Sequence, residues 1–223
     1  MTIATPRMAR VPAAERGITT GDFLVPIRVG ERISARVRHA ILVVLGALFI
    51  AATAYIAIPI PGTPVPVTAQ AFGVLAVGGA LGLRRGVMAA LLCLLIGAVG
   101  LPVYAQHAAG LDTFASIEGG RIALAPTGGY LVGFVVAAGL VGRLSELGWD
   151  RSVRGSLAAF ALGTLVIYLV GVPWLAVSLG VSAREAVDLG LAPFLVGAAI
   201  TLVVVAGIFP VAWWVIGKRA TDR

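Results

Sequence analysis

Six long apolar runs divide the 223 residues of this chain, and its basic residues fall almost entirely into alternate gaps between those runs. Fifteen of the 17 Lys and Arg residues lie before the first run, between the second and third, between the fourth and fifth, or after the sixth. Only Arg121 and Arg184 lie in the remaining gaps. By the positive-inside rule, this alternation predicts six membrane-spanning helices with both termini in the cytoplasm.

The composition indicates the same class of protein. Hydrophobic residues make up 59% of the chain and charged residues 12%, and the mean hydropathy is +1.01. A soluble domain of this length has too few polar residues to cover so much apolar surface. We therefore predict an all-α integral protein of the cell membrane. Topology accounts for the net charge of +7, because no basic stripe interleaved with aromatic residues indicates nucleic-acid binding.

The hydropathy pattern predicts three segments along the chain. Residues 1–38 are expected to form a basic cytoplasmic tail, residues 39–217 a six-helix membrane domain, and residues 218–223 a short cytoplasmic tail. The six spans are expected near residues 39–60, 68–83, 86–101, 126–141, 156–179 and 191–216.

Small residues form a stripe on the first expected span. Ala47 and Ala51 lie four positions apart, and such a small-xxx-small pattern lets two helices approach closely in lipid. Two interpretations stay open at this point. The stripe is either an internal helix contact or a docking surface for another membrane protein.

The first outer connection, Ile58 to Thr68, reads IPIPGTPVPVT and carries four prolines and no charge. Proline fixes an extended backbone and removes donors, so this segment can lie at low dielectric more cheaply than an ordinary loop. Irregular backbone at membrane depth usually lines a site. We expect a rigid lid or pocket wall here.

The second long outer connection, residues 102–125, is rich in polar side chains and leads into the next span through APTGGY. A connection of this length is typical of a binding loop. Glycine pairs let backbone approach a ligand, and the starts of helices favour an anionic group. The candidate ligand contacts from these segments and from the fifth span are Tyr104, Gln106, Thr127, Gly129, Tyr130 and Trp174.

The sequence offers little for catalysis or metal binding. Its only histidines are His39, at the entrance of the first span, and His107, in the outer loop, and Cys93 is a lone thiol. No expected span carries Asp, Glu or Lys. We therefore predict no enzymatic activity, no metal and no cofactor, and an intramembrane enzyme is the alternative from another class.

Several ordered stretches resemble one family: IPIPGTPVPVTAQAFGVL, GLRRGVMAALLCLLIGAVGLPVYA, APTGGYLVGF and LVGVPWLAVSLG followed by LGLAPFLVG. They are similar to BioY, the biotin-specific substrate-binding subunit of energy-coupling factor transporters. The resemblance covers about residues 47–217. It implies a six-helix protein that captures biotin from outside, with a transmembrane coupling subunit and two ATPases as partners. It also implies that Ala47 and Ala51 meet the coupling subunit.

The chain departs from the family pattern at the last span. Members similar to it carry a PFxxGDxxK run whose acid and lysine contact biotin, and here Ala198 and Thr201 occupy those positions. Biotin is then expected to be held by substitute contacts. Arg121 and helix N-termini would face its carboxylate, and Gln106, Tyr104, Thr127 and Thr201 its ureido ring. A divergent relative that captures a different, less polar molecule is the alternative, as is a structural or regulatory protein without transport.

Overall fold

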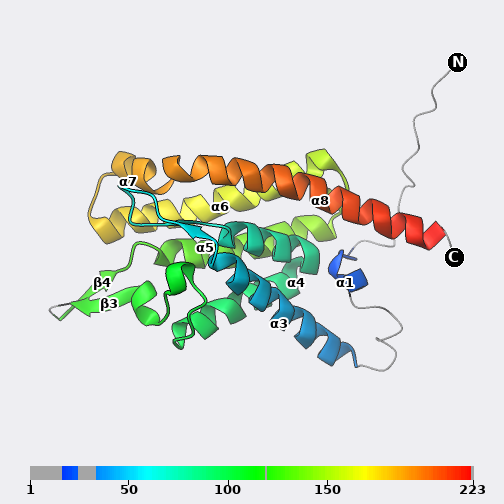
Figure 1. Ribbon diagram of the computed structural model, residues 1–223, viewed down its shortest axis with the longest axis horizontal. Coiled ribbons are helices and arrows are strands. Elements are labelled where there is room, and N and C mark those ends of the chain that lie inside the picture. Colours follow the sequence, from blue (N-terminus) through cyan, green and yellow to red (C-terminus); the bar gives the residue numbers. More distant parts are fainter. Residues whose placement is uncertain (1–16, 25–33, 119, 222–223) are drawn as a thin grey trace, which may run out of the picture.

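The computed structural model describes residues 17–24, 34–118 and 120–221. Five long helices dominate it: α3 (Ala35–Ala54), α4 (Gln70–Ala98), α5 (Gly128–Glu146), α6 (Val153–Leu179) and α8 (Leu195–Thr221). They pack in chain order, α3 and α5 against α4, α6 against α5, and α8 against α6 (Figure 1). Within the described residues, five stretches are long and apolar enough to cross a membrane.

Helix α4 contains both of the second and third expected spans, and it is broken at Gly82. This residue has a φ of 81° and a ψ of 178°, outside any helical conformation. A Cβ added to Gly86 would lie 2.9 Å from the Cα of Gly78. In a continuous helix these residues would be about 12 Å apart, so the two halves of α4 fold back on each other. Figure 1 shows this reversal beside α3.

Capping residues explain where several helices begin and end. The Ser34 hydroxyl accepts a hydrogen bond from the Val37 amide, so α3 begins four residues before the expected start of the first span. The same helix ends at Ala54, six residues early, because Pro59 and Pro61 favour extended backbone. Gly180, with a φ of 67°, closes α6.

Short elements connect the helices. Strands β1 (Ala57–Ile58) and β2 (Val67–Thr68) pair antiparallel on either side of the proline-rich segment. Strands β3 (Ala115–Glu118) and β4 (Arg121–Leu124) form a second hairpin before α5. The short helix α7 (Ala183–Gly190) precedes α8. Single 3₁₀ turns cover residues 105–107, 111–113, 149–151 and 192–194.

The stripe predicted on the first span lies inside the bundle. Ala47 is 2% exposed and Ala51 8%, and both belong to a buried cluster shared by α3 and α4. Gly46 packs beside them so closely that an added Cβ would lie 3.0 Å from Ala89. An internal helix contact, the first of the two interpretations, therefore accounts for these residues in this structure. The outward surface of α3 is formed instead by larger side chains such as Leu45 and Leu48.

A short segment from the expected N-terminal tail packs onto the bundle. Helix α1 (Gly21–Leu24) places Asp22 beside Arg38 of α3 and Arg85 of α4. The Phe23 ring contacts Trp213 of α8, with centroids 6.0 Å apart. The beginning and the end of the described chain thus meet at one end of the bundle (Figure 1). Residues 1–16 and 25–33 of that tail, and residues 222–223, lie outside the described residues.

Candidate functional site

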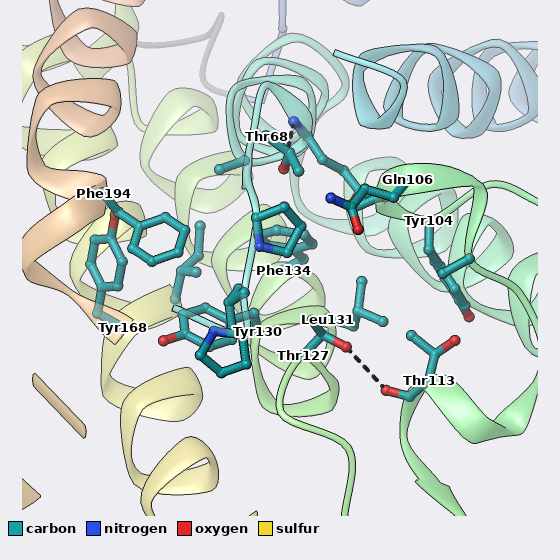
Figure 2. Close-up of a pocket in the computed structure, with 18 residues that line it drawn as sticks. Thr68, Tyr104, Gln106, Thr113, Thr127, Tyr130, Leu131, Phe134, Tyr168 and Phe194 are labelled. Carbon is teal, nitrogen blue, oxygen red and sulfur yellow. Dashed lines mark hydrogen bonds between the residues drawn. The ribbon is translucent and has the colours of Figure 1, made fainter. Parts of the chain in front are cut away.

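A cavity of about 180 Å³ lies at the opposite end of the bundle, where α4 and α5 begin. The proline-rich hairpin, the loop after α4 and the first turns of α5 supply most of its wall, and α6 and Phe194 complete it. Figure 2 shows Tyr104, Gln106 and Thr113 on one side and Tyr168 and Phe194 on the other. Four of the residues expected to contact a ligand line this cavity: Tyr104, Gln106, Thr127 and Tyr130.

The proline-rich hairpin forms one wall, as expected from its sequence. Pro64, Val65 and Pro66 line the cavity, and Val65 is buried. The Thr63 hydroxyl donates to the carbonyl oxygen of Leu189 at 2.7 Å, which ties the hairpin to α7. Because proline already restricts the backbone, this wall loses little further conformational freedom when it is ordered.

Tyr104 holds the loop after α4 against that helix. Its ring packs over Gly97, where an added Cβ would overlap it, and its hydroxyl donates to the carbonyl oxygen of Leu94. Burial raises the pKa of Tyr104 to about 12, so the phenol stays protonated near neutral pH. One face of this fixed ring borders the cavity.

Two residues of the same loop have strained backbone. Gln106 and His107 have φ values of 56° and 63°, which residues other than glycine rarely adopt. Such conformations cost about 1 to 3 kcal/mol each and cluster at functional sites. The turn brings Gln106 to the cavity, whereas the His107 ring packs against Tyr55 with centroids 4.7 Å apart.

The start of α5 is held by tryptophan packing. Trp174 of α6 lies so close to Gly129 that a Cβ added there would be 2.2 Å from the Trp174 Cβ. The indole Nε1 donates to the carbonyl oxygen of Ala125 at 2.9 Å. Neither Trp174 nor Gly129 lines the cavity. Their glycine-to-indole contact instead positions Thr127, whose hydroxyl donates to the Thr113 carbonyl oxygen at 3.3 Å.

Tyr130 connects the cavity to the loop before α8. Its hydroxyl donates to the Gly190 carbonyl oxygen at 2.8 Å, and its ring stacks near Phe194 with centroids 6.2 Å apart. Gly171 and Gly190 leave the space that this ring and hydroxyl occupy. The buried ring therefore forms a fixed cavity wall between α5 and Phe194.

Two other expected ligand contacts lie elsewhere. Arg121 is exposed on the β3–β4 hairpin, opposite Glu118 in the strand register, and does not line the cavity. Thr201 lines a second cavity of about 50 Å³, together with Ala198. The two cavities share part of their walls, so Thr201 lies next to the main one.

Sequence reasoning missed several lining residues. Gln70 is almost fully buried at the first turn of α4, and its amide nitrogen lies 3.5 Å from the Val103 carbonyl oxygen. Thr68 ends the proline-rich segment and Gln70 is the first polar residue after it, and that position was a usable signal. The other missed polar or aromatic lining residues are Thr113, Phe134, Tyr168 and Phe194. Among the described residues, no group of three or more His, Cys, Asp or Glu side chains could hold a metal ion.

Comparison with known proteins identifies the family of this chain. The model of the BioY family matches residues 28–218. The chain belongs to the BioY family. Biotin transporter BioY from Rhizobium etli is 39% identical over 150 residues, which cover 64% of this chain and 75% of the relative. Biotin transporter BioY from Thermotoga maritima is 37% identical, with coverage of 67% and 81%.

A probable biotin transporter BioY from Pyrococcus horikoshii is 38% identical to this BioY-family chain, with coverage of 68% of the chain and 83% of the relative. The crystal structure of the S-component for biotin from an ECF-type ABC transporter has the same fold, with a TM-score of 0.67. The two sequences are 24% identical, and the alignment covers 86% of this chain and 95% of the S-component. These likenesses favour neither an intramembrane enzyme nor a different substrate class.

Proposed function

We propose that this protein is the biotin-binding, substrate-capture subunit of an ATP-driven vitamin uptake transporter in the cell membrane. The observation that carries the proposal is membership of the BioY family over residues 28–218, combined with a cavity where that family's ordered motifs meet. The motifs IPIPGTPVPVT and APTGGY lie more than 50 residues apart in the chain, yet both contribute to the cavity wall.

Six membrane crossings with both termini in the cytoplasm complete the proposal. The break at Gly82, where the two halves of α4 fold back on each other, supports two crossings by α4 and six in total. The end of the bundle that carries α1 also carries five basic residues: Arg38, Arg84, Arg85, Arg143 and Arg154. This excess of positive charge supports a cytoplasmic position for that end. The cavity then faces outward, toward the incoming vitamin.

Transport energy is proposed to come from partners: a transmembrane coupling subunit and two ATPase subunits. No GxxxxGK[ST] motif occurs in the sequence, so the chain lacks a P-loop for nucleotide. Binding is proposed to involve no catalysis, with Tyr104, Gln106, Thr127 and Tyr130 as first contacts. For Ala47 and Ala51 to meet a coupling subunit, α3 would have to separate from α4, because both side chains face that helix.

Titration of the purified full chain with biotin tests this function. Isothermal calorimetry in detergent should show saturable binding with one biotin per chain. Gln106→Ala should weaken binding about tenfold, because one hydrogen bond to a buried ligand is worth about 1 kcal/mol or slightly more. Ser178→Ala is the control, since that hydroxyl bonds within its own helix to the Leu175 carbonyl oxygen at 2.9 Å. A folded protein that takes up no biotin would contradict the proposal.

A further inference from the structure

Two cavities with a shared wall lie side by side near the start of α8. The smaller, of about 50 Å³, borders the larger one through Thr68, Ala71 and Phe194 and through residues of α6. Beyond that shared wall it is bounded by Thr164 of α6 and by Gly197, Ala198 and Thr201 of α8. The two cavities are therefore direct neighbours.

Neither cavity is lined by a charged side chain among the residues that the structure describes. Arg121, the cation expected to face a carboxylate, lies on the exposed β3–β4 hairpin. Taking an ionised carboxylate out of water is costly unless a cation or several hydrogen-bond donors replace the water. The lining thus provides polar groups but no positive charge that could pair with a bound anion.

Thr164 is the exceptional residue of the second cavity. Its Oγ1 is buried and has no hydrogen-bond partner among the described residues. A threonine in a helix usually donates to a carbonyl oxygen one turn earlier, as Thr53 does to Ile50 at 2.8 Å. Buried polar groups in proteins are nearly always paired by hydrogen bonds. The unpaired Thr164 hydroxyl therefore indicates that a ligand in the cavity supplies its partner. Thr201 and Thr68 add two further hydroxyls to the same wall.

Resting on the proposed function, we infer that the second cavity binds an uncharged polar group of the ligand through Thr164 and Thr201. A hydroxyl both donates and accepts, so it suits a carbonyl, an amide or an ester equally well. The protein therefore binds neutral biotin derivatives, esters and amides of its carboxyl group, at least as readily as the free acid. Ala198 and Thr201 of α8 bring no charge to this wall.

Three probes test the inference on the purified full chain in detergent: biotin, biotin methyl ester and biotinamide. Both neutral probes should bind at least as tightly as the acid, because the uncharged lining offers no charge-assisted bond to a carboxylate. Tighter binding of the acid, by about tenfold or more over both neutral probes, would overturn the inference and leave the proposed function standing. Failure of all three to bind the folded chain would overturn both.

A set of variants tests the role of the hydroxyl. Thr164→Val keeps the shape of the side chain and should weaken binding of the methyl ester about tenfold, whereas Thr164→Ser should retain most of the affinity. Ser178→Ala, whose hydroxyl bonds within its own helix, should change nothing. Thermal unfolding of each variant establishes that it is folded. Unchanged affinity in folded Thr164→Val, or equal losses in the Val and Ser variants, would refute the assigned contact.

Discussion

The end of the bundle that carries α1 and the end that carries the cavities hold their polar atoms in different ways. At the α1 end, Asp22 pairs with Arg85 at 2.8 Å and with Arg38 at 3.5 Å. Arg143 and Glu146 form another pair near the break in α4. At the cavity end, hydroxyls, amides and backbone carbonyl oxygens bond to one another. No charged side chain among the described residues lines either cavity there.

Backbone strain follows the same division. Both described residues other than glycine with positive φ, Gln106 and His107, lie at the cavity end. The α1 end instead uses regular helix ends closed by caps and ion pairs, such as the Glu146 carboxylate that accepts from the Leu83 amide at 2.9 Å. We infer that the ion pairs at the α1 end hold the helices together, whereas the strained backbone at the cavity end lowers stability and shapes an uncharged site.

The largest expected effect comes from filling the cavity end. Ala71 lines both cavities, so Ala71→Trp would place an indole where the ligand binds. Biotin affinity should fall about a thousandfold or more, which corresponds to roughly 4 kcal/mol, because no ligand volume remains. Calorimetry measures the affinity. Ala52→Trp, on the exposed surface of α3, is the matched control and should bind normally; retained affinity in Ala71→Trp would place the site elsewhere.

The fold was largely predictable because the patterns of hydropathy and charge extend over whole segments of the chain. Six apolar runs and the alternating arginines indicated the helices, and errors of a few residues arose at their ends. The reversal within α4 was predictable too, because Arg84 and Arg85 separate the second and third expected spans, and the helix breaks beside them at Gly82. Local sequence does not single out Gly82 among 29 glycines as the breaking residue, because the close approach of Gly78 and Gly86 depends on the folded chain.

The site was predictable only in part. Tyr104, Gln106, Thr127 and Tyr130 were found because they lie in unusual loops or beside them. Residues in the middle of a span, such as Thr164 and Tyr168, were missed because their importance depends on which helix face meets the cavity. Trp174 was expected to touch the ligand, yet its indole packs on Gly129, and a sequence pattern alone cannot tell these two contacts apart.

A buried carboxylate at the α1 end should give the next largest effect. Asp150 is 0% exposed, and its Oδ2 accepts from the Trp213 Nε1 at 2.8 Å. Burial raises the pKa of Asp150 to about 6, although the Trp213 hydrogen bond and the nearby Arg151 act in the opposite direction. A raised folded-state pKa means that the charged form destabilises the protein above pH 6. That cost decreases as the pH falls below about 6 and is gone below the unfolded-state pKa of 3.8, where Asp150 is protonated in both states.

Asp150→Asn tests this directly. At pH 7 the free energy of unfolding of the variant should exceed that of the wild type by about 3 kcal/mol, and the difference should shrink to a small fraction of this value by about pH 4. Thermal and denaturant unfolding in detergent between pH 4 and 8 measures it. Asp112→Asn, an exposed change at the cavity end, is the control variant. A difference that grows toward low pH would have the wrong sign.

Introducing charged side chains into the wall of the second cavity should have a smaller effect on ligand binding. The double change Ala198→Asp with Thr201→Lys introduces an acid and a cation into the wall of the second cavity. Preference for biotin over its methyl ester should rise about thirtyfold, because a charge-assisted hydrogen bond is worth roughly 2 kcal/mol. Competition binding with the two ligands measures this ratio. Ala198→Asp alone should weaken acid binding, and an unchanged ratio in the double variant would contradict the position of the carboxyl group near α8.

The smallest effect is expected from the ion pairs at the α1 end. Burial alone would raise the pKa of Asp22, but the Thr19 amide and the Arg85 and Arg38 guanidiniums together hold it below its usual value. Its stabilising contribution is therefore present above about pH 4 and is lost as the pH falls, opposite in sign to Asp150.

Asp22→Asn should lower the free energy of unfolding by about 1 kcal/mol at pH 7, since partly exposed ion pairs contribute little each. The loss should shrink toward pH 3 because the wild-type carboxyl becomes protonated there, and unfolding curves across that range measure it. Glu185→Gln, exposed on α7, is the control. Biotin affinity should not change in Asp22→Asn, because the ion pair and the cavities lie at opposite ends of the bundle. A change of tenfold or more would mean that the two ends are energetically coupled, and the charged end would then influence binding as well as hold the helices together.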